Sequence, residues 1–125
     1  MSRIVLWVSD LNHQAEFYSA LLAAPISSGT SEFADVSDGQ NSVLIHILPE
    51  EYRTSVNAGE VAQAREEAAI KPVFIVNDID SAQSRVEKFG VSFGSEKNVY
   101  GDLAYLDCID PEGNVIQLSQ RISQS

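Results

Sequence analysis

The period of apolar and polar positions changes along the chain, and these changes predict its elements. Residues 3–9 form a β-branched and aromatic run without Pro or Gly, which is typical of a buried strand. Apolar positions then recur at helical spacing over residues 11–23, and Pro25 stops that helix. The next predicted elements are a loop, a short strand, a hairpin turn and a strand, at 27–30, 32–37, 38–39 and 42–48.

The second half of the chain repeats the order of the first. Laying Val8-Ser9-Asp10-Leu11 on Val76-Asn77-Asp78-Ile79 places strand on strand and helix on helix. Asp80 and Gln83 fit a capping box at the start of the second helix, and Gly90 ends it. The predicted strands of this half are 73–76, 91–97, 102–109 and 114–120.

This duplication predicts an α+β fold, a single domain over residues 1–125 made of two modules that each have the order strand, helix, strands. The modules are predicted at 1–48 and 72–125, joined by an acidic, Ala-rich connector at 49–71 with a short, mostly solvated helix over Glu60–Ala68. In each module the helix covers one sheet face and leaves the other face free. Two such modules side by side form a curved mixed sheet whose open face can enclose a ligand in a cleft.

Composition and net charge limit which kinds of binding partner are expected. The 125 residues carry a formal net charge of -10, which repels phosphate backbones and anionic lipid surfaces, so neither nucleic acid nor membrane is an expected partner. The single cysteine, Cys108, lies in an apolar strand pattern and is interpreted as a buried structural thiol in a reducing compartment. The apolar run from Ile4 to Val8 is too short for a signal peptide, so the expected location is cytoplasmic.

The stretch 110–120 carries a resemblance to a known family. Asp110-Pro111-Glu112-Gly113-Asn114 is a tight turn, and the strand after it alternates inward and outward positions. With Val8-Ser9-Asp10-Leu11 and Phe17-Tyr18, it resembles the glyoxalase/bleomycin-resistance/dioxygenase group, the vicinal oxygen chelate superfamily. The resemblance covers essentially the whole chain. It implies two βαβββ modules, a site inside the curved sheet and a homodimer.

In enzymes of that superfamily, the resemblance implies metal ligands on the first strand of each module and on the last strand. Those places hold Arg3, Lys71 and Gln117 here, and aligning the last strands of the two halves makes His46 a fourth. Arg and Lys carry only donors and are cationic, and Gln is a weak ligand, so only the histidine is a normal metal ligand. The residues therefore predict the fold without its chelate, and no metal or other cofactor is expected.

The same positions also suit a small-molecule site. Alternation on the first strand predicts that Ile4, Leu6 and Val8 face the helix. A few convergent polar groups on an apolar wall are typical of such sites. For the arginine and the lysine, the alternative is a side chain that reaches solvent from the start of a strand, and for the histidine it is a satisfied core position. The predicted ligand-binding residues are Arg3, Val5, Trp7, His46, Lys71 and Gln117.

Three functions remain open at this point. The first is a metal-independent protein similar to the bleomycin-resistance branch, a homodimer that binds an unknown small organic molecule. The second is an atypical lyase, isomerase or dioxygenase in which His46 is the general base or lone metal ligand. The third is an interaction module with a filled cavity. The acidic surface favours a cationic ligand, whereas Arg3 and Lys71 favour an anion, so the charge of the ligand stays open.

Overall fold

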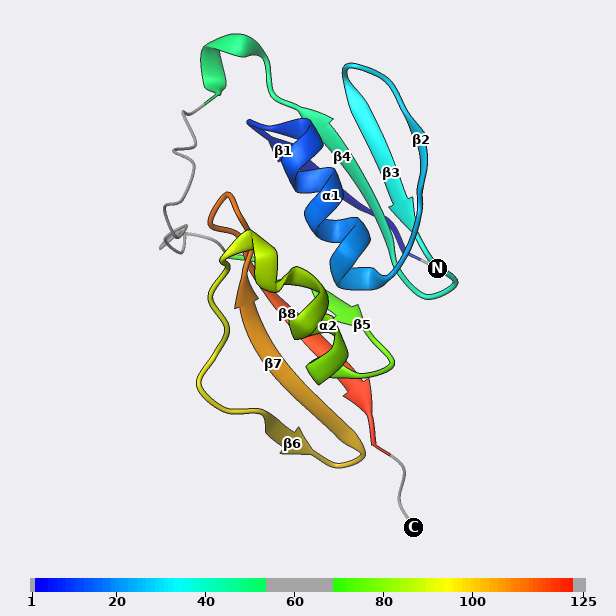
Figure 1. Ribbon diagram of the computed structural model, residues 1–125, viewed down its shortest axis with the longest axis vertical. Helices are drawn as coiled ribbons and strands as arrows, with labels where there is room; N and C mark the ends of the chain where they lie inside the picture. The colour runs from blue at the N-terminus through cyan, green and yellow to red at the C-terminus, as the bar shows by residue number, and fades with distance from the viewer. Residues whose placement is uncertain (1, 54–68, 123–125) are drawn as a thin grey trace.

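The computed structural model describes residues 2–53 and 69–122, and it confirms an α+β fold of two βαβββ modules (Figure 1). The predicted connector helix over Glu60–Ala68 lies outside the described residues. The elements of the first module and the turn after it are β1 (Ile4–Val8), α1 (Leu11–Leu22), β2 (Ile26–Gly29), β3 (Phe33–Ser37), β4 (Ser42–Ile47) and the short 3₁₀ helix η1 (Glu50–Tyr52). Those of the second are β5 (Val73–Ile75), α2 (Ile79–Val86), the 3₁₀ turn η2 (Glu87–Phe89), β6 (Asn98–Tyr100), β7 (Leu103–Ile109) and β8 (Val115–Arg121).

The strands form two four-stranded mixed sheets, where the sequence predicted one curved sheet. Their orders are β1-β4-β3-β2 and β5-β8-β7-β6, so each module builds its own sheet. In both sheets the first strand runs parallel to the last, and the other pairs are antiparallel. Figure 1 shows the modules side by side, with α1 and α2 next to each other in front of their sheets.

Alternation along β1 has the predicted direction. Val8 is fully buried, and Ile4 and Leu6 pack against the core under α1, whereas Val5 and Trp7 are half exposed on the other side. The core therefore lies between the helices and one face of each sheet. Burying this apolar face is the main driving force for the fold.

Each helix begins at an aspartate, because a carboxylate can accept an N–H that has no partner in the first turn. Asp10 accepts from the backbone N–H of His13 at 3.1 Å, and Asp78 accepts from that of Ser81 at 3.1 Å. The predicted capping box at Asp80 is wrong by two residues, since the cap is Asp78. Gly90 ends the second helical segment in a left-handed conformation (φ 66°), as predicted.

Two strand predictions need correction. Residues 26–29 form β2, where a loop was predicted at 27–30, because an edge strand can be polar when its backbone pairs with a neighbour. The strand predicted at 91–97 lies instead at 98–100, as β6. Phe93 makes only an isolated bridge to Cys108, so the apolar pattern there reflects packing against the core and not a ladder.

The Asp110 turn joins the second module to the first. The backbone N–H of Gly113 donates to the carbonyl of Asp110 at 3.0 Å, which closes the predicted turn. The Asp110 carboxylate is fully buried and also accepts from the Tyr18 hydroxyl at 2.7 Å and from Gln14 Nε2 at 3.1 Å. Its two oxygens therefore hold both its own turn and the middle of α1.

Glu112 makes a second connection across the modules. Its carboxylate oxygens accept from the backbone N–H groups of Ser9 and Asp10, at 2.7 and 2.9 Å. A negative charge at the first turn of a helix is favourable because the backbone N–H groups there point outward. The turn after β7 thus completes the start of α1.

Asn41 makes the third connection, from the turn between β3 and β4. Its Nδ2 donates to the carbonyl of Ile75 at 2.7 Å, and its Oδ1 accepts from the N–H of the same residue at 2.9 Å. A side-chain amide thus pairs with the edge of β5 as a neighbouring strand would. This satisfies both outward backbone groups of Ile75 at the seam between the modules.

Candidate functional site

The sheet faces that lie away from α1 and α2, here called the open face, carry the predicted site residues. In Figure 1 both helices lie in front of their sheets, so the open face looks away from the viewer. Its half-exposed apolar side chains are Val5, Trp7, Val73 and Ile75, with exposed fractions from 47% to 51%. These four side chains alternate along β1 and β5 with core residues that face the helices.

Trp7 and His46 form an aromatic pair on the first sheet. The two residues lie opposite each other in the β1–β4 pairing, with ring centroids 4.3 Å apart and ring planes inclined by 41°. His46 Nδ1 lies 2.9 Å from the carbonyl oxygen of Ile47, which can only accept, so Nδ1 carries a proton. The histidine is therefore neither in the apolar core nor free, but oriented beside the indole.

Arg3 is held on the same face by a polar network. Its Nη2 lies 3.3 Å from Asp35 Oδ2, and its Nε donates to Ser42 Oγ at 3.1 Å. The hydroxyl of Ser37 donates to the other oxygen of Asp35 at 2.6 Å. Arg3 thus reaches solvent, with 53% of its side chain exposed, but its charge is paired.

Lys71 and Gln117 converge on one carboxylate of the second sheet. Lys71 Nζ lies 2.9 Å from Asp107 Oδ2, and Gln117 Nε2 donates to Asp107 Oδ1 at 3.1 Å. Partial burial of this carboxyl opposes its ionisation, but the hydrogen bonds from Lys71 and Gln117 and the lysine charge prevail and lower the pKa of Asp107. The aspartate is therefore charged at neutral pH.

The strand register shows which positions of the two modules correspond. Asp35 lies opposite Leu44 in the β3–β4 pairing, and Asp107 lies opposite Gln117 in the β7–β8 pairing. Gln117 also lies opposite Val73 of β5, just as Leu44 lies opposite Val5 of β1. Position 44, two residues before His46, is therefore the counterpart of Gln117.

This register corrects the alignment that made His46 a fourth metal position. It also shows that Arg3–Asp35 and Lys71–Asp107 are the same ion pair made once in each module. Sequence reasoning missed both aspartates. Their place on the open face follows from alternation with buried neighbours, such as Ala34 beside Asp35, but nothing in the pattern names their cationic partners.

The residues at the expected metal positions do not fit a divalent ion. The guanidinium of Arg3 and the ammonium of Lys71 have no lone pair to give and repel a cation. Gln117 directs its amide nitrogen at Asp107. Within residues 2–53 and 69–122, no group of three or more His, Cys, Asp or Glu side chains has the arrangement of a metal site.

The site residues thus lie on two sheets. Trp7 and His46 lie in the first sheet, with Arg3 directly before β1, and Gln117 lies in the second, with Lys71 shortly before β5. The enclosed cleft expected from the sequence stays a prediction.

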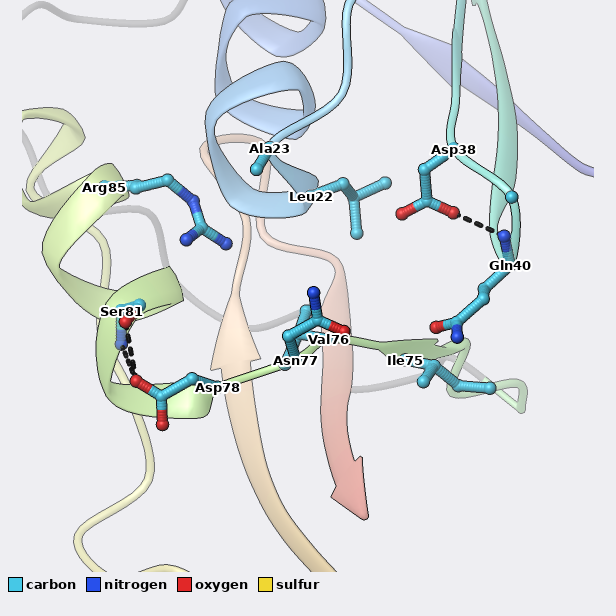
Figure 2. A pocket seen from close by; sticks show the side chains of 11 residues that line it. Leu22, Ala23, Asp38, Gln40, Ile75, Val76, Asn77, Asp78, Ser81 and Arg85 are labelled. Carbon is cyan, nitrogen blue, oxygen red and sulfur yellow. Dashed lines mark hydrogen bonds between the residues drawn. The ribbon is translucent and has the colours of Figure 1, made fainter.

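A groove of about 440 Å³ lies elsewhere, at the seam between the modules (Figure 2). Its charged side chains are engaged in holding the fold together. Asp38 accepts from the N–H groups that close its turn, and Arg85 donates to the carbonyls of Ala20 and Leu21 at the end of α1. Hydrogen bonds from the side chain and backbone of Ser81 lower the pKa of Asp78, which caps α2. We interpret this groove as a structural seam.

A second hollow, of about 420 Å³, lies at the start of α1 and is lined by Ser9, Asp10 and Arg53 among others. Near this helix end, the carboxylates of Asp10 and Glu112 already accept from the backbone N–H groups of Ser9, Asp10 and His13. Among the described helices, none is both long and apolar enough to cross a bilayer.

Comparison with known proteins identifies a family over nearly the whole chain. The model of the Glyoxalase/Bleomycin resistance protein/Dioxygenase superfamily matches residues 1–118. No curated protein matches the chain.

Solved structures share the fold at low sequence identity. A glyoxalase/bleomycin resistance protein from Albidiferax ferrireducens is 18% identical, with a TM-score of 0.66 over 97% of this chain and 98% of its own. An integron cassette protein from Vibrio cholerae is 23% identical, with a TM-score of 0.62 over 96% and 93%. A fosfomycin resistance protein from Listeria monocytogenes, in complex with Mn(II) and sulfate, is 18% identical, with a TM-score of 0.68 over 97% and 89%. At these identities the structures show the fold alone.

Proposed function

Because the chain belongs to the Glyoxalase/Bleomycin resistance protein/Dioxygenase superfamily, we propose that it is a small-molecule-binding protein that uses its open face without a catalytic metal. The ligand is a small organic molecule, and two copies of the chain bring their open faces together around it.

One observation carries this proposal. The first-strand position of each module, where the family's enzymes would hold a metal ligand, is a cation paired with a carboxylate: Arg3 with Asp35, and Lys71 with Asp107. Ion-paired cations leave no lone pair for a metal, but they keep free N–H groups that can bind an organic molecule. The chemistry of these residues thus favours binding over metal-assisted turnover.

The aromatic pair supports the same function. Trp7 is half exposed and lies against His46, so one broad apolar surface lies close to polar groups that can orient a ligand. Small-molecule sites combine these two elements. An exposed tryptophan on a sheet face also loses apolar contact with water when a ligand or a second copy covers it.

The exposed apolar side chains support a homodimer. Val5 and Trp7 on β1, and Val73 and Ile75 on β5, lie on strands at the edges of their sheets. When the first module of one copy faces the second module of the other, the Arg3 and Lys71 sites come from different chains. This arrangement would bring the residues of the two sheets together in one site.

The test is native mass spectrometry of freshly purified protein, with metal analysis of the same sample. We expect the mass of a dimer, no stoichiometric transition metal, and a co-purified organic molecule or an added one that binds. Because Trp7 is the only tryptophan, its emission reports directly on the open face during a ligand titration. A monomer whose Trp7 emission responds to no compound of a diverse library would contradict the proposal.

An atypical enzyme is the second candidate, and the orientation of His46 favours it. With the Nδ1 proton on the Ile47 carbonyl, Nε2 is the nitrogen that in a neutral ring carries the lone pair needed by a general base or a single metal ligand. Metal analysis of wild type and His46→Ala separates the candidates. Stoichiometric Zn, Ni, Mn or Fe that is retained by wild type and lost in His46→Ala would favour the enzyme.

A further inference from the structure

We propose that Asp35 and Asp107 set the charge selectivity of the open face, so that it binds uncharged aromatic molecules and rejects organic anions. This inference rests on the proposed function and names the chemical class of its ligand. The acidic surface favours cationic ligands, whereas Arg3 and Lys71 favour anionic ones. If Asp35 and Asp107 offset the charges of Arg3 and Lys71, the face no longer favours anions.

The first pair is the more enclosed. Only 18% of the Asp35 side chain is exposed, and its two oxygens accept from Arg3 and from Ser37. The Ser37 hydroxyl also lies 3.0 Å from that of Ser42, which accepts from Arg3 Nε. The guanidinium is therefore held by a carboxylate and a hydroxyl, and an incoming anion does not meet an isolated positive charge.

The second pair is more open and can be changed with less effect on the fold. The exposed fractions of Lys71 and Asp107 are 46% and 42%. Gln117 holds the other carboxylate oxygen, so Asp107 stays beside the lysine. An anion that approaches Lys71 must share it with this carboxylate or displace it, and it then lies near a like charge.

The same pair of a cation and a carboxylate occurs in both modules, so neither module offers an anion an unpaired positive charge at this position. In each module a cation at the start of the first strand pairs with a carboxylate on the third strand, Arg3 with Asp35 and Lys71 with Asp107, so the two charges of each pair offset each other. The formal net charge of -10 adds long-range repulsion of anions. The remaining N–H groups of Arg3 and Lys71 can still donate to uncharged oxygen or nitrogen atoms.

The aromatic pair selects for a ring. The indole of Trp7 is half exposed with His46 at its side, and an uncharged aromatic molecule can stack there without breaking either ion pair. An anionic ligand would have to share the cation of one pair with its carboxylate or displace that carboxylate. The open face therefore combines an aromatic surface with neutral hydrogen-bonding positions.

Two fluorescent probes that differ in one group test this selectivity. N-phenylnaphthylamine is uncharged, and anilinonaphthalene sulfonate has the same ring system with an added anionic group. Both absorb where tryptophan emits, so quenching of Trp7 by energy transfer reports binding of either probe. We expect wild type to bind the uncharged probe at least about tenfold more tightly than the sulfonate.

Asp107→Asn then tests the cause of the selectivity. It frees the charge of Lys71, and we expect sulfonate binding to tighten roughly fivefold, while binding of the uncharged probe changes by less than about twofold. Asp80→Asn is the matched control, because Asp80 is the partner of a lysine too, Lys97 at 2.7 Å, but lies on α2 and away from the open face. The control changes the net charge equally and should leave both affinities as in wild type.

The outcomes separate the two proposals. Equal binding of both probes by wild type, or no gain of sulfonate binding in Asp107→Asn while its circular dichroism matches wild type, would overturn the charge selectivity and leave the binding function standing. Equal gains in Asp107→Asn and Asp80→Asn would show an effect of net charge alone and also overturn it. Failure of both probes to quench Trp7 in any variant would contradict the binding function itself.

Discussion

Tyr18→Phe removes one buried hydroxyl and leaves the ring in place, so it isolates a single link between the modules. The Tyr18 hydroxyl donates to Asp110 Oδ2 at 2.7 Å, and both side chains are almost completely buried. A hydrogen bond to a charged group contributes about 1.5–3 kcal/mol. The same oxygen also accepts from Gln14 and Asn114, so it keeps partners in the variant. We therefore expect the free energy of unfolding to fall by about 2 kcal/mol.

Urea unfolding followed by circular dichroism measures this difference. The midpoint should move to lower urea with an unchanged slope, because the surface exposed on unfolding stays the same. Tyr100→Phe is the control, since Tyr100 is exposed on β6 and its change should stay within about 0.5 kcal/mol. An equally small change for Tyr18→Phe would refute the assigned role of the Tyr18–Asp110 bond.

The pH dependence gives the same prediction a second test. Burial, and then the nearby Asp110 charge, raise the pKa of Tyr18 well above its ordinary value of 10.0. Above pH 10.0 the folded chain keeps a proton that the unfolded chain releases, so this part of the stability is complete below that pH and is lost as the pH rises further. The stability difference between wild type and Tyr18→Phe should therefore narrow above pH 10.0. A constant difference would contradict the raised pKa.

Two further predictions concern buried groups. Asn41→Ala removes both side-chain partners of the Ile75 backbone, so we expect the free energy of unfolding in urea to fall by about 2 kcal/mol and the Ile75 amide to exchange its hydrogen faster. Asn77→Ala, at an exposed position nearby, is the control. An unchanged exchange rate in Asn41→Ala would contradict the role of Asn41. Burial, and then the Asp110 charge, raise the pKa of Cys108 to about 12, so its thiol should react with a disulfide reagent at neutral pH only when the chain opens, and rapid labelling of folded protein would contradict this.

Much of the fold follows from local pattern, because side-chain period and helix caps are local properties. The alternation on residues 4–8 predicted the correct buried face, whereas the cap of the second helix was predicted at Asp80 and lies at Asp78. The polar edge strand at 26–29 was missed since its pairing depends on the backbone of β3 and not on its own side chains. The shift of β6 to 98–100 has a similar cause, because an apolar pair such as Val91 and Phe93 can pack on a core without joining a ladder.

The site was less accessible to sequence reasoning because its contacts are between distant residues. Arg3 and Asp35 lie 32 positions apart, and Lys71 and Asp107 lie 36 apart. No period connects them, and only the strand register brings them together. The register also shows that Leu44 corresponds to Gln117. Aligning the sequences of the two short strands had made His46 the counterpart.

The Asp110 turn supplies hydrogen-bond partners of the first helix from a late part of the sequence. Ser9 and Glu112 are separated by 103 positions, and Tyr18 and Asp110 by 92. During synthesis, α1 therefore leaves the ribosome long before the carboxylates that complete it. Contacts of such high sequence separation slow folding. Until they form, the apolar surface of α1 that they help to fix in place stays exposed. The first module therefore makes all its hydrogen bonds only after the Asp110 turn of the second has been synthesised, although the two halves look like independent copies in the sequence.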